Sequence, residues 1–331
     1  MQQRERAQDV YFIPGTRSSP LFVFIHGLGM SKDVWVRPQG AKILGGKFPL
    51  CVMLGQEPEP HEMPPDEAAF LTFGKTQRPL MTLFHDISAL GCPCAAWSQR
   101  RPAGKAAYAL EELSSLLERY KNEAGAGIVL IGHSRGGVIA RKYAESTPHN
   151  ILGIVTLGSP HGGSTMALWA HRISMITSLI SPFFDNAQKN TFANTIKMVL
   201  GLWESEAIVE LMPGSALIGS LEATPRREFL TLTLGGTRPE LFSLYSVRPD
   251  ARGMAVYKKR FSVPAVFSDI LPDGLIPDEI TNGMGDGLVS ERNTHIPYED
   301  RHLAYYLNHI EMLFDDRARG DVLEALSVFF H

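Results

Sequence analysis

The sequence lacks the features that mark membrane-spanning, secreted and nucleic-acid-binding proteins. None of its apolar runs reaches the roughly 18 residues that a transmembrane helix needs, so we expect no membrane span. The formal net charge is −3 and there is no long basic run, which argues against a nucleic-acid surface. The N-terminal segment MQQRERAQDVYF has no apolar core of a signal peptide. We therefore expect a soluble, cytoplasmic chain, unless a leader has been removed.

Cysteine is also scarce. The three cysteines, Cys51, Cys92 and Cys94, are odd in number and form no CxxC pair, which argues against a disulfide framework and against a structural zinc site. The neighbours His85 and Asp86 are too few to make a metal site. We therefore expect neither a metal nor a cofactor.

Short apolar runs alternate with amphipathic stretches along most of the 331 residues. Alternation of this kind predicts βαβ units and a mostly parallel sheet flanked by helices, the α/β class. The expected strands are 21–25, 92–97, 128–132, 151–157 and 229–234, with a further one at 50–54. The expected helices are 79–90, 106–120, the segment after residue 134, and a closing helix at 322–329. The polar stretch 55–67 is expected to be an exposed loop.

The alternation stops between residues 164 and 228. This segment is rich in Met, Leu, Ile, Phe and Trp but contains no short buried-strand pattern. We interpret it as a helical cap, or lid, inserted into the core, although extra helices packed as core would give the same stripes. The expected organisation is therefore a core in two parts, 1–163 and 229–331, with the cap at 164–228 between them.

The most informative motif is Gly-His-Ser-Arg-Gly at 132–136. An apolar strand precedes it and a helix-forming sequence follows, and this strand–turn–helix setting gives the Gly-x-Ser-x-Gly pattern its meaning. Such a turn lifts the serine Oγ clear of the sheet edge, at the carboxyl end of a strand where ligands bind. Ser134 is therefore the candidate nucleophile. A nucleophilic serine needs a base and a carboxylate that orients it. Asp286, in a Gly-Asp-Gly turn, and His309 follow it in that order.

Taken together, four stretches resemble the α/β-hydrolase superfamily, in its lipase and esterase branch. They are FIHGLGMS at 24–31, IGHSRGGVIAR at 131–141, TLGSPHGGS at 156–164, and GDGLVS at 285–290 with NHIEML at 308–313. The resemblance implies the α/β-hydrolase fold and a Ser134–His309–Asp286 triad. It also implies an oxyanion hole formed by the backbone N–H groups of Leu28 and Arg135.

Other residues compete for these roles. The alternative acids Asp273, Asp278 and Asp300 lie in Pro-flanked or exposed contexts and lack the family pattern. The alternative bases are His302, which is a nearby rival of His309, and His295, which is a weaker one. Three further histidines sit inside the motifs and are expected to hold loops by hydrogen bonding: His26, His133 and His161.

These observations predict a serine hydrolase that cleaves apolar carboxylic esters through an acyl-enzyme, a lipase or esterase. The expected partner is a small-molecule or lipid ester, with transient contact to a lipid interface. An acyltransferase on the same triad is one alternative, because an alcohol can replace water in the second step. A non-catalytic binding protein on a hydrolase scaffold is another, although it would not need all three side chains.

Overall fold

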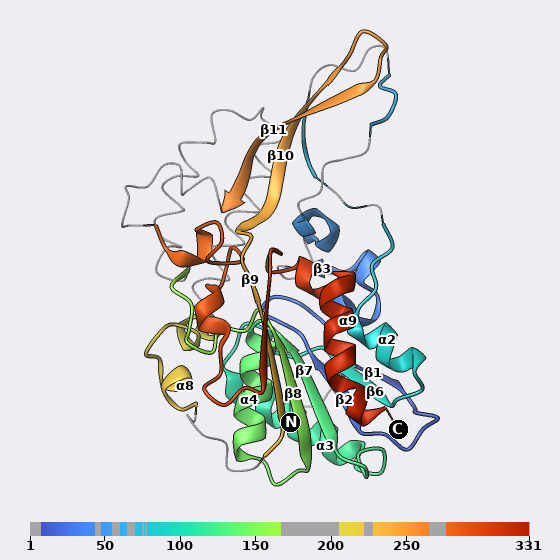
Figure 1. Ribbon diagram of the computed structural model, residues 1–331, viewed down its shortest axis with the longest axis vertical. Helices are drawn as coiled ribbons and strands as arrows, with labels where there is room; N and C mark the ends of the chain where they lie inside the picture. Colours follow the sequence, from blue (N-terminus) through green and yellow to red (C-terminus); the bar gives the residue numbers. More distant parts are fainter. Residues whose placement is uncertain are drawn as a thin grey trace, which may run out of the picture.

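A seven-stranded sheet forms the centre of the computed structural model (Figure 1). Its strands lie in the order β1–β6–β2–β7–β8–β9–β12, and the edge strand β1 alone runs antiparallel to its neighbour. They are β1 Val10–Ile13, β2 Leu21–Ile25, β6 Cys94–Trp97, β7 Ile128–His133, β8 Ile151–Leu157, β9 Leu230–Gly236 and β12 Arg301–Tyr305. The structure describes residues 8–43, 48–54, 60–64, 70–74, 76, 78–166, 205–221, 228–264 and 276–330.

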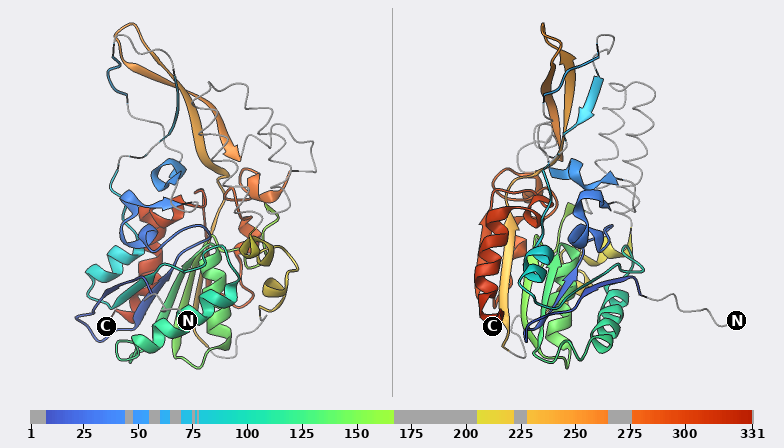
Figure 2. Two further views of the ribbon diagram at one scale, coloured as in Figure 1. Left: turned by 180° about the vertical axis from the view of Figure 1, so that it is seen from behind. Right: turned by 90° about the vertical axis from the view of Figure 1, so that its right-hand side faces the viewer.

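Helices cover both faces of this sheet, which is why its central strands are apolar at successive positions. Phe22 and Phe24 of β2 pack into one core cluster, while Leu21, Val23 and Ile25 pack into another on the opposite face. The covering helices are α2 Leu83–Ala89 and α9 Asp316–Ala325 on the first face, and α3 Ala106–Arg119 and α4 Arg135–Ser146 on the second (Figure 2). The expected α/β class with a mostly parallel, helix-flanked sheet is confirmed.

A second, antiparallel sheet projects from this body (Figure 1). It pairs β5 Phe70–Phe73 with β10 Glu240–Pro249, and β10 with β11 Ala255–Pro264. Of the 55–67 stretch, the structure describes residues 60–64; four of these are exposed, while the side chain of Met63 packs against the β10–β11 hairpin. This sheet was not predicted from the sequence.

One predicted strand is wrong. Residues Leu50–Leu54 form a 3₁₀ helix, η2, rather than a strand. Four of these five residues are buried, and a short run that is buried all round has no periodicity that could distinguish strand from helix.

Several element boundaries differ from the prediction. Helix α2 begins only after Thr82, which caps it together with His85. The strand expected from Cys92 begins at Cys94, after Pro93, which has no N–H to donate. The closing helix begins earlier than expected, because the Asp315 side chain accepts from the backbone N–H of Ala318 and so starts α9.

The remaining elements are short. They are α1 Asp33–Val36, η1 Pro38–Gly40, β3 Lys42–Ile43, β4 Phe48–Pro49, α7 Glu206–Glu210, α8 Ala216–Gly219, η5 Asp278–Ile280, η6 Glu291–Thr294, η7 Glu311–Leu313 and η8 Leu326–Phe329. Of the predicted cap, residues 167–204 and 222–227 lie outside the described residues, whereas α7 and α8 are helical. Within the described ranges, no helix has the length and apolar character that crossing a membrane requires.

Candidate active site

Ser134 lies on the sharp turn between β7 and α4, in a conformation that is rare for a residue with a side chain. Its φ is 54° and its ψ is −127°, and no other non-glycine residue of the described chain has a positive φ. Such a conformation costs about 1–3 kcal/mol and persists only where its surroundings impose it. A β-carbon on Gly132 would overlap the N atom of Gly137, and one on Gly136 would overlap the O atom of Ile25. The two glycines therefore permit the close approach of strand and helix that forms this turn.

Asp286 and His309 form a buried pair. The Nδ1 atom of His309 lies 2.7 Å from Oδ2 of Asp286, and the two residues are 0% (Asp286) and 2% (His309) exposed. Oδ1 of Asp286 accepts from the backbone N–H groups of Leu288 and Val289, at 3.0 and 2.8 Å. Because an ionised carboxylate only accepts hydrogen bonds, it holds the proton of a neutral His309 on Nδ1. The lone pair of the imidazole is then on Nε2.

A pocket is lined by both His309 and Ser134. Among the described residues that line it, Ser134, His309 and Ser164 are polar. The rest are apolar: Leu28, Met30, Ile43, Met53, Pro160, Met166, Ile208, Leu211, Leu288, Val289 and Ile310. Asp286 is fully buried behind His309 and does not line the pocket. The arrangement suits an apolar ligand with one reactive polar group.

Arg135 has separate tasks for its backbone and side chain. Its guanidinium donates to Oε1 of Gln99 at 2.7 Å and to the carbonyl of Gly104 at 2.6 Å, so the side chain is structural. Burial lowers its pKa to about 10, which leaves it charged at neutral pH. Its backbone N–H belongs to the first turn of α4, where helix N–H groups have no intrahelical acceptor.

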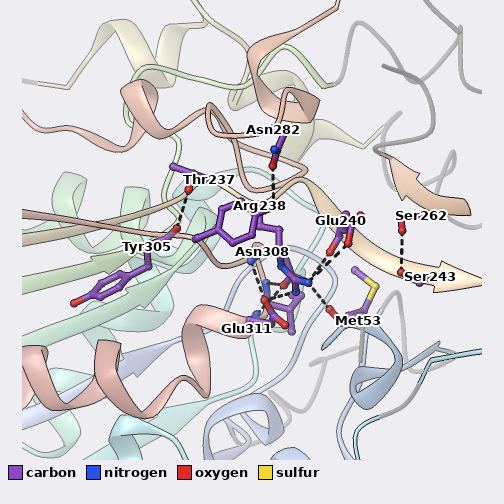
Figure 3. A network of polar contacts seen from close by, with 12 residues as sticks. Met53, Thr237, Arg238, Glu240, Ser243, Ser262, Asn282, Tyr305, Asn308 and Glu311 are labelled. Atoms are coloured by element: carbon purple, nitrogen blue, oxygen red, sulfur yellow. Dashed lines mark hydrogen bonds and ion pairs between the residues drawn. The ribbon is translucent and has the colours of Figure 1, made fainter. Parts of the chain in front are cut away.

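A polar network that the sequence analysis missed anchors the loop carrying His309 (Figure 3). The Asn308 amide donates to the carbonyls of Met53 and Glu240, at 2.9 and 2.8 Å, and its Oδ1 accepts from the backbone N–H of Glu311 at 2.8 Å. Glu311 in turn pairs with Arg238. Burial raises the pKa of Glu311, and the Arg238 charge opposes this shift. The loop that carries His309 is therefore held by groups from two distant parts of the chain, around Met53 and at Arg238 and Glu240.

The three motif histidines hold loops, as expected. His133 donates from Nε2 to the carbonyl of His309 at 2.8 Å, and His161 bonds to the Thr156 hydroxyl at 3.1 Å. His26 bonds through Nδ1 to the next carbonyl of the chain, at 2.8 Å. Burial lowers the pKa of His133 and of His161 well below the ordinary value, and that of His26 to about 4. All three are neutral at pH 7.

The rival acids and bases have other partners. Asp278 pairs with an arginine at 2.9 Å, and Asp300 accepts a backbone N–H of β9 at 2.7 Å. His295 and His302 stack on each other with ring centroids 3.7 Å apart, and neither lines the pocket. Asp273 lies outside the described residues.

Two groups of residues bear on the expectation that no metal is bound. His85 and Asp86 serve in the cap of α2 and in an ion pair with an arginine, respectively. In contrast, Glu291, His295 and His302 each offer a ligand atom, and these atoms lie within 4.8 Å of one another. The sequence analysis did not predict this second group.

Comparison with known proteins identifies the fold. A family model described as a PGAP1-like alpha/beta domain matches residues 104–217. The structure is similar to that of Bacillus licheniformis lipase BlEst2 in its mature form, with a TM-score of 0.52 and 16% identity over 96% of this chain and 97% of that chain. The chain has the α/β-hydrolase fold. The propeptide form of the same lipase gives a TM-score of 0.53 and 16% identity over 96% of this chain, which spans 53% of that longer chain. No curated protein matches the sequence.

The candidate residues follow strands of the main sheet of this α/β-hydrolase fold. Ser134 follows β7, Asp286 comes after β9, and His309 follows β12. Because parallel strands end at the same edge of a sheet, residues far apart in the sequence meet there. Their chain order, serine before acid before histidine, is that of α/β-hydrolase triads.

Proposed function

We propose that the protein is a serine hydrolase that cleaves carboxylic esters of apolar acids. The observation that carries this proposal is that Ser134, on a strained turn, shares an apolar pocket with His309, whose Nδ1 is bonded to the buried carboxylate of Asp286. A base oriented by a carboxylate and facing a serine is the arrangement that nucleophilic acyl transfer requires.

In the proposed mechanism, Oγ of Ser134 attacks the ester carbonyl while Nε2 of His309 takes the proton of this hydroxyl. The backbone N–H groups of Leu28 and Arg135 donate to the oxyanion that forms, a contribution of about 3–4 kcal/mol per donor in hydrolases of this kind. Asp286 stabilises the imidazolium, which then gives its proton to the leaving alcohol. Water attacks the acyl-enzyme in the second step, with His309 again acting as the base.

The apolar lining supports an acyl-binding role for the pocket. Met166, Ile208 and Leu211 come from the segment 164–228 and line the same pocket as Ser134. We therefore propose that this segment is a cap that contributes to the acyl site, with the core formed by 1–163 and 229–331. Each buried methylene of an acyl chain contributes about 0.8 kcal/mol, so kcat/KM is expected to rise roughly fourfold per carbon until the pocket is full.

Labelling with a fluorophosphonate probe tests the nucleophile. The wild type should be labelled at Ser134, and Ser134→Ala should be neither labelled nor active on p-nitrophenyl esters of increasing acyl length. Ser164→Ala is the matched control, because Ser164 lines the same pocket but donates its hydroxyl to the Leu288 carbonyl at 2.7 Å. Labelling of the folded Ser134→Ala variant at another residue, with activity retained, would contradict the proposal.

A further inference from the structure

Three side chains outside the pocket direct Lewis-basic atoms toward one point. Nε2 of His302 lies 2.8 Å, and Nε2 of His295 lies 3.2 Å, from the same oxygen of Glu291. Glu291 begins η6 and His302 lies on β12, so the group joins two elements. None of the three residues lines the pocket.

The opposite sides of both imidazole rings are already bonded. Nδ1 of His295 lies 2.6 Å from Oε1 of Glu299, and Nδ1 of His302 lies 2.7 Å from the hydroxyl of Thr233. That hydroxyl also donates to Oε2 of Glu299. The Glu299 carboxylate also accepts from the backbone N–H of Ile296 at 3.0 Å.

These bonds fix where the protons lie. Because the Thr233 hydroxyl donates to Glu299, its oxygen accepts from Nδ1–H of His302, which leaves a lone pair on Nε2 when this ring is neutral. A lone pair then faces the Glu291 carboxylate at 2.8 Å. Two acceptors at this distance repel each other unless a cation lies between them.

A proton between the imidazoles and the Glu291 carboxylate relieves this repulsion only in part. The rings of His295 and His302 stack with centroids 3.7 Å apart, which disfavours a proton on the inner nitrogen of both rings at once. A divalent cation instead satisfies both imidazoles and the carboxylate at once, and it takes the place of any proton held between them.

We propose that Glu291, His295 and His302 bind a zinc ion, with water as the fourth ligand. In a tetrahedral site with metal–ligand distances near 2.0–2.1 Å, the ligand atoms lie about 3.3 Å apart. The His295–Glu291 separation of 3.2 Å matches this value, and the His302–Glu291 separation of 2.8 Å would widen slightly on binding. Glu299 and Thr233 supply the outer hydrogen bonds that orient zinc-binding histidines. His295 has 44% of its side chain exposed and gives the ion a path to the site.

The ion would link the two segments that carry the buried acid–histidine pair. The N–H of Glu291 donates to the Met284 carbonyl at 2.8 Å, closing the turn that contains Asp286. His302 lies on the strand that leads to His309. The role inferred for zinc is therefore structural, and it does not depend on the proposed hydrolase activity.

Zinc binding to the full chain tests this inference. After dialysis against EDTA, titration with zinc chloride should give about one ion per chain. At about 100 times the dissociation constant, zinc should raise Tm by about 3–6 °C. Cobalt(II) should give the visible absorption bands of a tetrahedral site.

Matched variants assign the ligands. Glu291→Gln keeps the shape of the side chain, and His295→Gln changes a side chain at the exposed side of the site. Each variant should bind zinc at least tenfold more weakly and should lose the rise in Tm on zinc addition. His61→Gln is the control, because His61 is an exposed histidine that bonds to Tyr257 beside the projecting hairpin. If the wild type binds no more zinc than Glu291→Gln and His295→Gln do, or if His61→Gln causes the same loss, the site does not exist. Ester hydrolysis by zinc-free protein would leave the proposed function intact.

Discussion

Replacing Gly158 by alanine would perturb the acid–histidine pair directly. Gly158 follows β8 with a φ of 58°, in the left-handed region that favours glycine. A β-carbon there would lie 2.9 Å from Sδ of Met312, and 3.1 Å from both Oδ2 of Asp286 and Nδ1 of His309. The added methyl would therefore press on both atoms of their hydrogen bond.

The two effects of this substitution can be separated in magnitude. Left-handed backbone costs an alanine about 1–2 kcal/mol, and the reduced freedom of the unfolded chain returns about 0.4–1 kcal/mol. The free energy of unfolding should therefore fall by about 1 kcal/mol, or roughly 2–4 °C in Tm. The methyl contacts require the pair to move by a few tenths of an ångström. Because a misplacement of about 1 Å can cost 10²-fold, we expect kcat/KM to fall about tenfold.

Gly253→Ala is the matched control. Gly253 has a φ of 78° in the turn of the β10–β11 hairpin, and no atom of the described chain lies within 4 Å of where its β-carbon would be. Both variants should show the backbone loss of about 1 kcal/mol in a thermal melt, but Gly158→Ala alone should lose activity on a p-nitrophenyl ester. Equal kcat/KM for the two folded variants would refute the assigned role of the Asp286–His309 pair.

Three further predictions concern stability. Ser134→Gly relieves the positive φ and should raise the free energy of unfolding in urea by about 1 kcal/mol while abolishing activity; a loss of stability would contradict the strain. Asn308→Asp cannot donate its two buried hydrogen bonds and should lower that free energy by about 2–4 kcal/mol; an unchanged urea midpoint would contradict the network. His26, His133 and His161 have depressed pKa values, so the unfolded state binds more protons below pH 6.5. The free energy of unfolding should therefore fall toward pH 4 by up to about 1.4 kcal/mol per pH unit for each histidine. Between pH 7 and pH 5, urea unfolding should show a smaller drop in this free energy for His161→Gln than for the wild type.

The parts of the fold that sequence analysis predicted depend on local patterns. The strand before Ser134, the turn and the helix after it are all specified within about twenty adjacent residues, 128–146. An arrangement made by residues that are close together in the sequence can be predicted without a structure. The pairing of Asp286 with His309, by contrast, was expected only from a family resemblance.

The missed features depend on contacts between distant residues. Asn308 is adjacent to His309 in the sequence, but its partner Met53 is 255 residues away. Glu291 and His302 meet because a turn and a strand converge, and their spacing matches no metal motif. The β10–β11 hairpin did carry a signal, since two strand-prone runs flank the turn-forming Asp250 and Gly253.

The energetics of the candidate site bear on the choice between the proposed acyl transfer and simple binding. The backbone at Ser134 is strained, and burying the charged Asp286 beside His309 carries a desolvation cost that the pair only partly offsets. A fold that merely bound apolar ligands in this pocket would be more stable with glycine at 134 and apolar residues in place of the pair. Features that lower stability are retained where the chemistry uses them. The combination of strain, a buried carboxylate and an apolar pocket therefore favours acyl transfer over simple binding.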